Sequence, residues 1–207
     1  ETYINTKQGR TTVNLDAPVF TFGHTIGFKG VLGGDHDFHV SEAVIYKRFW
    51  LSAGWGKVDC RLRGALQWNS VPYMLLLMPE ANLSYVLSEN TFSLINNMEF
   101  LSDRYVSAII NWDMNGKLFN RLPLVRKLKW REWLAVRCLW GALSEKNLQP
   151  LPKGSYQLDG QKPYWELSLG IHNIFKLVQI EYVRRLNYNN LPSAHKRGVR
   201  FTLRMTF

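Results

Sequence analysis

Oxygen and imidazole donors are concentrated in one short stretch of the sequence, residues 33–39 (GGDHDFH). Asp35, His36, Asp37 and His39 could bind a divalent cation, because carboxylate oxygens and imidazole nitrogens are common metal ligands. The alternative is a polar turn after two glycines, since Gly and Asp are favoured in turns. We favour the turn and expect no metal, because no distant acidic or His cluster offers further ligands.

Catalytic chemistry has little support in the sequence. His24, His172 and His195 have no Ser or Cys nucleophile at a recognisable spacing, and neither GxSxG nor HExxH occurs. Glu99 and Asp103 could act as paired carboxylates, but an arginine follows Asp103, so a turn or a loop ion pair is simpler. We therefore expect no enzyme activity and no cofactor.

Arginines recur at alternate positions of extended stretches. Such a set could line an anion-selective passage or hold an inserted plug or loop. It could instead pair across neighbouring strands with Asp59, Glu166 and Glu181, which is the interpretation we favour. The basic residues expected to face the interior of a barrel are Arg61, Arg63, Arg137, Arg185, Arg200 and Arg204.

Alternation with a period of two predicts the strands that position these side chains. Residues 198–207 (GVRFTLRMTF) alternate apolar side chains with Arg and Thr, as a two-faced strand requires. The same analysis predicts strands at 13–29, 37–52, 56–68, 91–101, 104–115, 130–142, 164–173, 176–188 and 197–207. Bacterial barrels usually have an even number of strands. Either a short strand is missed near residues 3–10, or the chain is one part of a larger barrel.

Composition excludes helical membrane spans and argues against nucleic acid. The mean hydropathy is -0.20 although 46% of the residues are hydrophobic, so apolar and polar residues are interleaved. The most apolar run, residues 71–78, is far shorter than the roughly 20 residues of a membrane-spanning helix. The net charge of +10 is scattered over strand positions, whereas nucleic-acid-binding domains gather basic residues in a patch. We assign the charge to a polar lumen and to loops.

Tryptophans and connections favour a membrane orientation. The indole rings of tryptophan gather at the interfaces between membrane and water. The tryptophans near predicted strand ends are Trp50, Trp55, Trp68, Trp112, Trp130, Trp140 and Trp165. If the last strand runs toward the periplasm, the long 143–163 connection is extracellular, as expected. Connections 69–90 and 116–129 would then be long and periplasmic, although periplasmic turns are usually short. Either these connections fold into the lumen or along the inner interface, or a strand is missed.

Several strings resemble a known family: NMEFLSDRY, NGKLFNRLPLVRKLKWRE, WGALSEKN, ELSLGIHNIFKLVQIEYVRRLNY and GVRFTLRMTF. Together they resemble the C-terminal region of a bacterial outer-membrane family of unknown function, whose members join an N-terminal carboxypeptidase-like regulatory domain to a C-terminal barrel. The resemblance covers most of residues 56–207, and the family name does not imply peptidase activity. It also implies a terminal signal that the outer-membrane assembly machinery recognises, with apolar positions Phe201, Leu203, Met205 and Phe207.

The expected fold is therefore all-β: an antiparallel transmembrane β-barrel. Residues 1–207 would form one domain, the C-terminal portion with about nine or ten strands of a larger barrel. The expected protein lies in the cell outer membrane and has a non-catalytic role in transport or envelope biogenesis. Its expected partners are outer-membrane lipid, the assembly machinery, other envelope proteins and the upstream part of the barrel. The alternative is a soluble basic all-β module that binds nucleic acid or anionic glycan.

Overall fold

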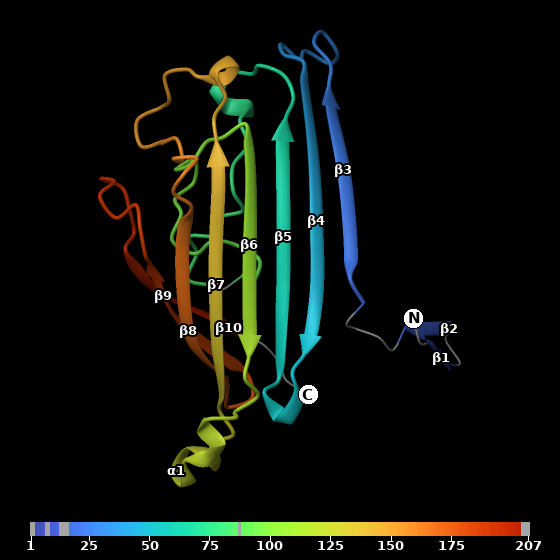
Figure 1. Ribbon diagram of the computed structural model, residues 1–207, viewed down its shortest axis with the longest axis vertical. Helices are drawn as coiled ribbons and strands as arrows, with labels where there is room; N and C mark the ends of the chain where they lie inside the picture. Colours follow the sequence, from blue (N-terminus) through green and yellow to red (C-terminus); the bar gives the residue numbers. More distant parts are fainter. Residues whose placement is uncertain (1–2, 7–8, 13–16, 87, 204–207) are drawn as a thin grey trace.

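The computed structural model describes residues 3–6, 9–12, 17–86 and 88–203, and its main feature is an eight-stranded antiparallel sheet (Figure 1). Each strand pairs with its neighbour along the chain, in the order β10-β9-β8-β7-β6-β5-β4-β3. The strands are β3 (Val19–Gly27), β4 (Phe38–Trp50), β5 (Lys57–Gln67), β6 (Arg104–Asp113), β7 (Arg131–Ala142), β8 (Tyr164–Ile174), β9 (Val178–Arg185) and β10 (Arg197–Leu203). Two further strands, β1 (Tyr3–Thr6) and β2 (Gly9–Thr12), form a separate two-stranded sheet.

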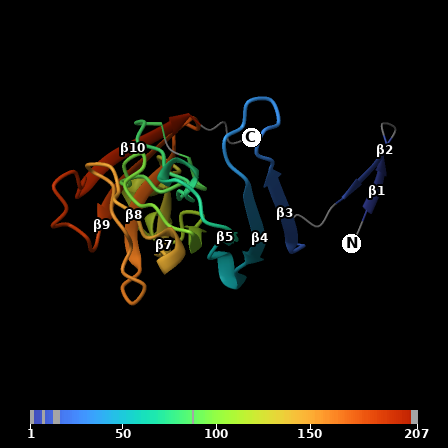
Figure 2. The same cartoon turned by 90° about the horizontal axis from the view of Figure 1, so that it is seen from above.

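The sheet is curved but open in the described part of the chain. Seen from above, β7 to β10 curl around one side, while β3 and β4 continue away from the curl (Figure 2). β3 and β10 are the two edges, and they do not pair with each other. The all-β antiparallel prediction is confirmed, whereas closure into a transmembrane barrel stays a prediction.

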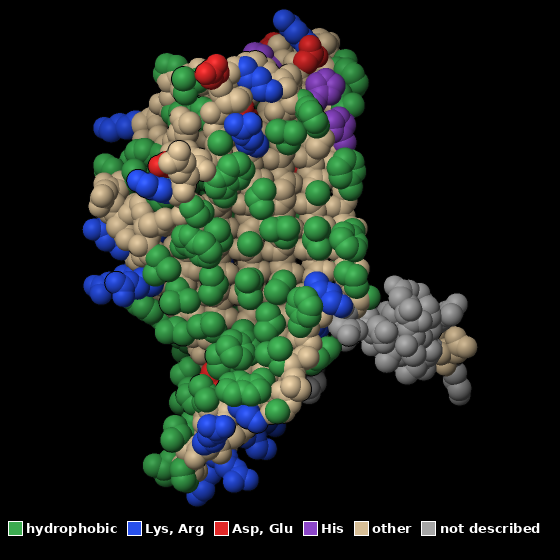
Figure 3. Space-filling model, in the orientation of Figure 1, with side chains coloured by type: hydrophobic (Ala, Val, Ile, Leu, Met, Phe, Trp, Pro, Cys, Tyr) green, Lys and Arg blue, Asp and Glu red, His purple; other side chains and the backbone are tan. Residues whose placement is uncertain are grey.

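Alternation gives the sheet two chemically different faces. On the convex face, apolar side chains such as Leu62, Ile110 and Leu169 are about half exposed. Figure 3 shows this face, where hydrophobic side chains form a broad band across the strands. The thiols of Cys60 and Cys138 are free and belong to the same set of alternate positions. The concave face carries the polar residues of the strands.

The connection between β5 and β6, residues 68–103, covers the concave face; we call it the insert. Its described residues form a short 3-10 helix, η2 (Tyr73–Leu75), and otherwise only isolated bridges. In Figure 2 it lies inside the curve of β7 to β10. Its residues Phe92, Ile95 and Phe100 are almost completely buried and pack in one core with Leu139 of β7 and Tyr164 of β8.

The strand predicted at 91–101 is wrong. Leu94 and Ile95 are adjacent and both fully buried, so the period of two fails there, and Met98 has a positive φ of 59°. The remaining eight predicted strands each correspond to one strand of the sheet, and β1 and β2 occupy the region where a missed strand was considered.

Because residues 91–101 do not form a strand, connection 69–90 lies at the opposite end of the sheet from connection 116–129, whereas the sequence analysis placed both at the same end. The insert leaves β5 and enters β6 at the same end of the sheet as the β3–β4, β7–β8 and β9–β10 connections. The opposite end carries residues 51–56, 114–130 and 175–177. The connection at residues 114–130 includes η3 (Phe119–Arg121) and the four-residue helix α1 (Pro123–Arg126). The β7–β8 connection includes η4 (Glu145–Asn147). None of the helices described is long and apolar enough to cross a membrane.

Candidate functional site

The candidate site is the polar interface between the insert and the concave face of the sheet. Burying a charged group without a partner is costly, so the side chains there must find partners in the sheet or in the insert. The buried polar side chains of β6 to β10 on this face include Ser107, Asn111, Arg137, Glu166, Ser168, Gln179, Glu181, Arg185 and Arg200.

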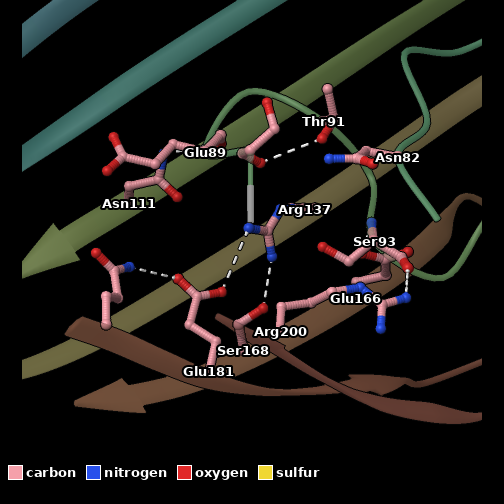
Figure 4. A network of polar contacts seen from close by, with 12 residues as sticks. Asn82, Glu89, Thr91, Ser93, Asn111, Arg137, Glu166, Ser168, Glu181 and Arg200 are labelled. Carbon is pink, nitrogen blue, oxygen red and sulfur yellow. Dashed lines mark hydrogen bonds and ion pairs between the residues drawn. The ribbon is translucent and has the colours of Figure 1, made fainter. Parts of the chain in front are cut away.

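Glu166 of β8 and Arg200 of β10 hold the backbone of the insert at Ser93 and Leu94 (Figure 4). The Glu166 Oε2 atom accepts the N–H of Ser93 at 3.0 Å, and Oε1 accepts the N–H of Leu94 at 2.9 Å. The Arg200 Nη2 atom donates to the carbonyl oxygen of Ser93. Hydrogen bonds to ionised groups are about twice as strong as neutral ones. This pair of side chains is therefore a backbone clamp.

Arg185 of β9 forms a second, fully buried contact with the insert. Its Nη1 atom lies 2.7 Å from Oε1 of Glu99, and both side chains are completely buried. The guanidinium also lies over the rings of Tyr164 and Phe100, at 4.8 and 5.6 Å from their centroids. The other oxygen of Glu99 accepts the N–H of Asn96 at 2.7 Å. Both charged groups therefore have several favourable neighbours.

Arg61 and Arg63 of β5 contact the insert nearer the open part of the sheet. The Arg61 Nη2 atom lies 3.4 Å from Oε1 of Glu80, and Arg63 Nη1 donates to the same oxygen. Arg63 Nη2 also lies 2.9 Å from Oε2 of Glu42 in β4. These side chains are partly exposed, so each pair contributes less than the buried contact of Arg185.

Arg137 of β7 is buried between strands instead. Its Nη1 atom donates to Oγ of Ser168, and Nη2 lies 3.7 Å from Oε2 of Glu181. The other oxygen of Glu181 accepts a hydrogen bond of 3.0 Å from Gln179. Ser168 lies in the neighbouring strand β8, but Glu181 lies in β9, so this ion pair spans β8 and differs from the pairing across neighbouring strands that we favoured from the sequence. Asp59, another expected partner, pairs with a different arginine, Arg48 of β4, at 2.6 Å.

The arginines described on the concave face thus serve mainly to hold the insert. Arg61, Arg63, Arg185 and Arg200 contact it directly. Their expected position in a barrel lumen requires a closed sheet, so that assignment stays a prediction.

The terminal segment is described only in part. Phe201 is half exposed on the convex face, and its N–H donates to the carbonyl oxygen of Tyr85 at 2.8 Å. The insert therefore covers the free edge of β10 at this position. The backbone of Leu203 pairs with β9. Outside the described residues lie Arg204, Met205 and Phe207.

The candidate metal ligands lie where the sequence placed them, around one turn. Asp35, His36 and Asp37 are in the exposed β3–β4 connection, and His39 is in β4. One oxygen of Asp37 accepts the N–H of Lys29 at 2.6 Å. Within the described parts of the chain, no three His, Cys, Asp or Glu side chains come together as a metal site would require.

Asp103 ties the end of the insert to the start of the β7–β8 connection. Its Oδ2 atom accepts the N–H and the hydroxyl of Ser144, and the side-chain amide of Asn147 at 3.0 Å. Burial alone would raise the pKa of Asp103, but these hydrogen bonds outweigh it and hold the pKa below its ordinary value. Glu99 and Asp103 therefore have separate structural partners.

Sequence reasoning missed the insert's contribution to this site. Glu80 lies in a connection without regular periodicity, and the Ser93–Leu94 backbone lies in the stretch wrongly predicted as a strand, so no pattern predicted what they face. A signal for Glu99 was available, because an isolated acidic residue between apolar neighbours needs a cation if it is buried. The identity of that cation, Arg185, could not be derived from spacing along the chain.

Comparison with known proteins identifies a family. Residues 1–147 match the model of the C-terminal domain of a family of unknown function, DUF5686. The chain belongs to this family. No curated protein and no solved structure matches it. The predicted resemblance to the C-terminal part of a family of unknown function is thereby confirmed, although the match covers residues 1–147 instead of most of 56–207. The outer-membrane location and the N-terminal regulatory domain stay predictions. The matched region of this DUF5686 protein holds β1 to β7 and the whole insert.

Proposed function

We propose that this DUF5686 domain is part of a transmembrane β-barrel in the outer membrane, with a non-catalytic role in transport or envelope biogenesis. The observation that carries the proposal is the contrast between the two faces of the sheet. Hydrophobic side chains are exposed across the convex face, while buried charged groups lie on the concave face. Exposed apolar surface of this extent usually marks an interaction with lipid or with another protein.

The dimensions of the strands support a membrane span. β3, β5, β6 and β8 have 9, 11, 10 and 11 residues, while β4 and β7 have 13 and 12 and β9 has 8. A tilted strand needs about 9–11 residues to cross the hydrocarbon core.

Seven of the eight tryptophans lie near the two ends of the sheet, as expected for interfacial rings, whereas Trp133 is buried. At the end that carries residues 114–130 are Trp50, Trp55, Trp112 and Trp130. At the opposite end are Trp68, Trp140 and Trp165.

The insert gives the proposal a more specific form. A polar concave face would line the lumen of a closed barrel, and the insert would occupy that lumen as an internal plug. Passage of a solute along this side would then require release of the contacts at Glu80, Ser93 and Glu99. Upstream strands would pair with the edge β3 and with the part of β10 that the insert leaves free, and the terminal residues would serve the assembly machinery.

The membrane proposal can be tested by extraction. In cells that make the protein, it should be found in the outer-membrane fraction, resist high salt and alkaline carbonate, and be released by detergent. Release by salt alone would contradict the proposal and favour the soluble basic module. Binding of the released protein to nucleic acid or to an anionic glycan would then be measured directly.

A further inference from the structure

An apolar groove of about 660 Å³ opens on the convex face beside the β6–β7 connection. Its volume lies within the range of about 300–1,000 Å³ that is usual for sites binding small molecules. One wall comes from the connection and the other from β8 and β9. The lining residues include Met114, Leu118, Phe119, Leu169, Ile180 and Tyr182.

Glu132 of β7 fixes the connection that forms the first wall. Its backbone carbonyl oxygen accepts the N–H of Met114 at 3.1 Å, and its Oε1 atom accepts the N–H of Phe119. The side chain is only 8% exposed, although it lies on the convex side of the strand. The groove is therefore a built feature, because the segment that bounds it is attached to the sheet by hydrogen bonds.

The connection that bounds the groove, which we call its rim, is strongly basic. Residues 114–131 contain no Asp or Glu, and their basic members are Lys117, Arg121, Arg126, Lys127, Lys129 and Arg131. In the described chain, Arg121, Arg126 and Lys127 are exposed and none of the three forms an ion pair. In Figure 3, Lys and Arg side chains gather at the end of the molecule where Figure 1 labels α1.

Apolar side chains are exposed among these cations. Leu122, Leu124 and Leu128 are 52%, 82% and 50% exposed. A surface that combines exposed leucines with unpaired basic residues has the composition of segments that lie in a membrane interface. The connection also lies at one end of the apolar band, where the headgroups of a bilayer would begin.

We propose that the groove and its rim form a binding site for an anionic phospholipid. One acyl chain would lie against Leu169, Ile180 and Tyr182, and the phosphate would lie among the side chains of Arg121, Arg126 and Lys127. A phospholipid combines an apolar chain with an anionic phosphate at one end, and the groove and rim present the complementary surfaces in the same order. This site rests on the proposed membrane position of the sheet and adds a lipid class to it.

The test uses the full chain in lipid nanodiscs that contain a trace of phosphatidylglycerol with a photoreactive acyl chain. Crosslinks should concentrate on the groove residues of β8 and β9. Phosphatidylcholine with the same chain should label them less. Because one basic residue near an anionic membrane surface changes binding about fivefold, the variant R121Q/R126Q/K127Q should lose most of the phosphatidylglycerol preference.

Two further variants serve as controls. K153Q/K162Q/K196Q removes three exposed cations from the opposite end of the sheet and should leave the labelling unchanged. Leu169→Trp fills the groove and should lower labelling there without altering the lipid preference at other surfaces. Circular dichroism should show unchanged β content in all variants, since the replaced side chains are exposed.

The outcomes separate this site from the proposed function. Equal labelling of the groove by the two lipids, or full labelling of R121Q/R126Q/K127Q, would overturn the lipid site while the membrane proposal stands. Recovery of the protein in the soluble fraction without detergent would overturn both.

Discussion

Replacement of Arg185 by leucine should release the insert from the concave face. The substitution removes the group that lies 2.7 Å from Glu99 and leaves that carboxylate buried without a cation. Removing one partner of a buried ion pair costs about 3–5 kcal/mol. Loss of the guanidinium from above Tyr164 and Phe100 adds to this cost. We therefore expect a free energy of unfolding lower by at least about 3 kcal/mol.

The double variant Arg185→Leu/Glu99→Gln tests whether the cost comes from the unpaired charge. It removes both charges, and the amide oxygen of glutamine can still accept the N–H of Asn96. Residues in direct contact usually show coupling energies of about 0.5–3 kcal/mol. The double variant should therefore be more stable than the sum of the two single changes predicts.

Arg184→Leu is the matched control, because Arg184 is the neighbouring residue on the exposed face of β9. Its effect should stay within about 0.5 kcal/mol. The free energies would be measured by urea unfolding in detergent, together with hydrogen exchange of the amides of the insert. The reasoning is refuted if the Arg184 and Arg185 variants lose equal stability, or if the two changes in the double variant are additive.

Three further predictions concern the convex face, the ends of the sheet and a turn. In bilayers, Leu62→Arg should cost about 2–4 kcal/mol near the midplane, whereas Leu148→Arg in a connection should cost little; equal costs would contradict a lipid-facing Leu62. Asp103→Ala should cost about 1–3 kcal/mol at neutral pH. Because its folded pKa is lowered, Asp103 stabilises the fold above the unfolded pKa of about 3.9, and this contribution is lost as the pH falls through the folded value. The difference between wild type and variant in urea unfolding should thus narrow below about pH 4, and a constant difference would exclude the carboxylate as the cause. Gly56→Ala should destabilise by more than about 1 kcal/mol, since φ is +76° and a Cβ atom would lie 1.9 Å from the carbonyl oxygen of Asp113; an unchanged melting temperature would argue against this turn.

The strands could be predicted from sequence because each one alternates over its whole length. In β5, Arg61 and Arg63 share one face because a period of two leaves no other arrangement. The insert follows no such rule. Apolar and polar side chains alternate over residues 92–94, which suggests a strand. Ile95 is also buried, however, and Met98 has a positive φ, so the alternation ends there. Short apolar runs of this kind do not distinguish a strand from an irregular segment that is buried on all sides.

The partners across the site could not be predicted for a related reason. Arg185 and Glu99 are 86 residues apart, and their contact depends on how a connection without periodicity folds back over the sheet. The groove has the same origin, since Leu118 and Tyr182 meet only after the β6–β7 connection bends toward β8 and β9. Periodicity determines which face a side chain occupies, whereas the path of a connection determines what covers that face.

The backbone clamp shows how the sheet can hold an insert with few requirements on its sequence. Glu166 and Arg200 bind the N–H and carbonyl groups of residues 93–94, which every residue except proline presents. These hydrogen bonds therefore do not depend on the chemical nature of the Ser93 and Leu94 side chains, although both side chains are buried and their size is restricted. Glu166 cannot change in the same way, because its loss would leave two buried N–H groups without acceptors. The specificity of this contact thus resides in the strands, and the sequence signal for it lies in β8 and β10 rather than in the segment they hold.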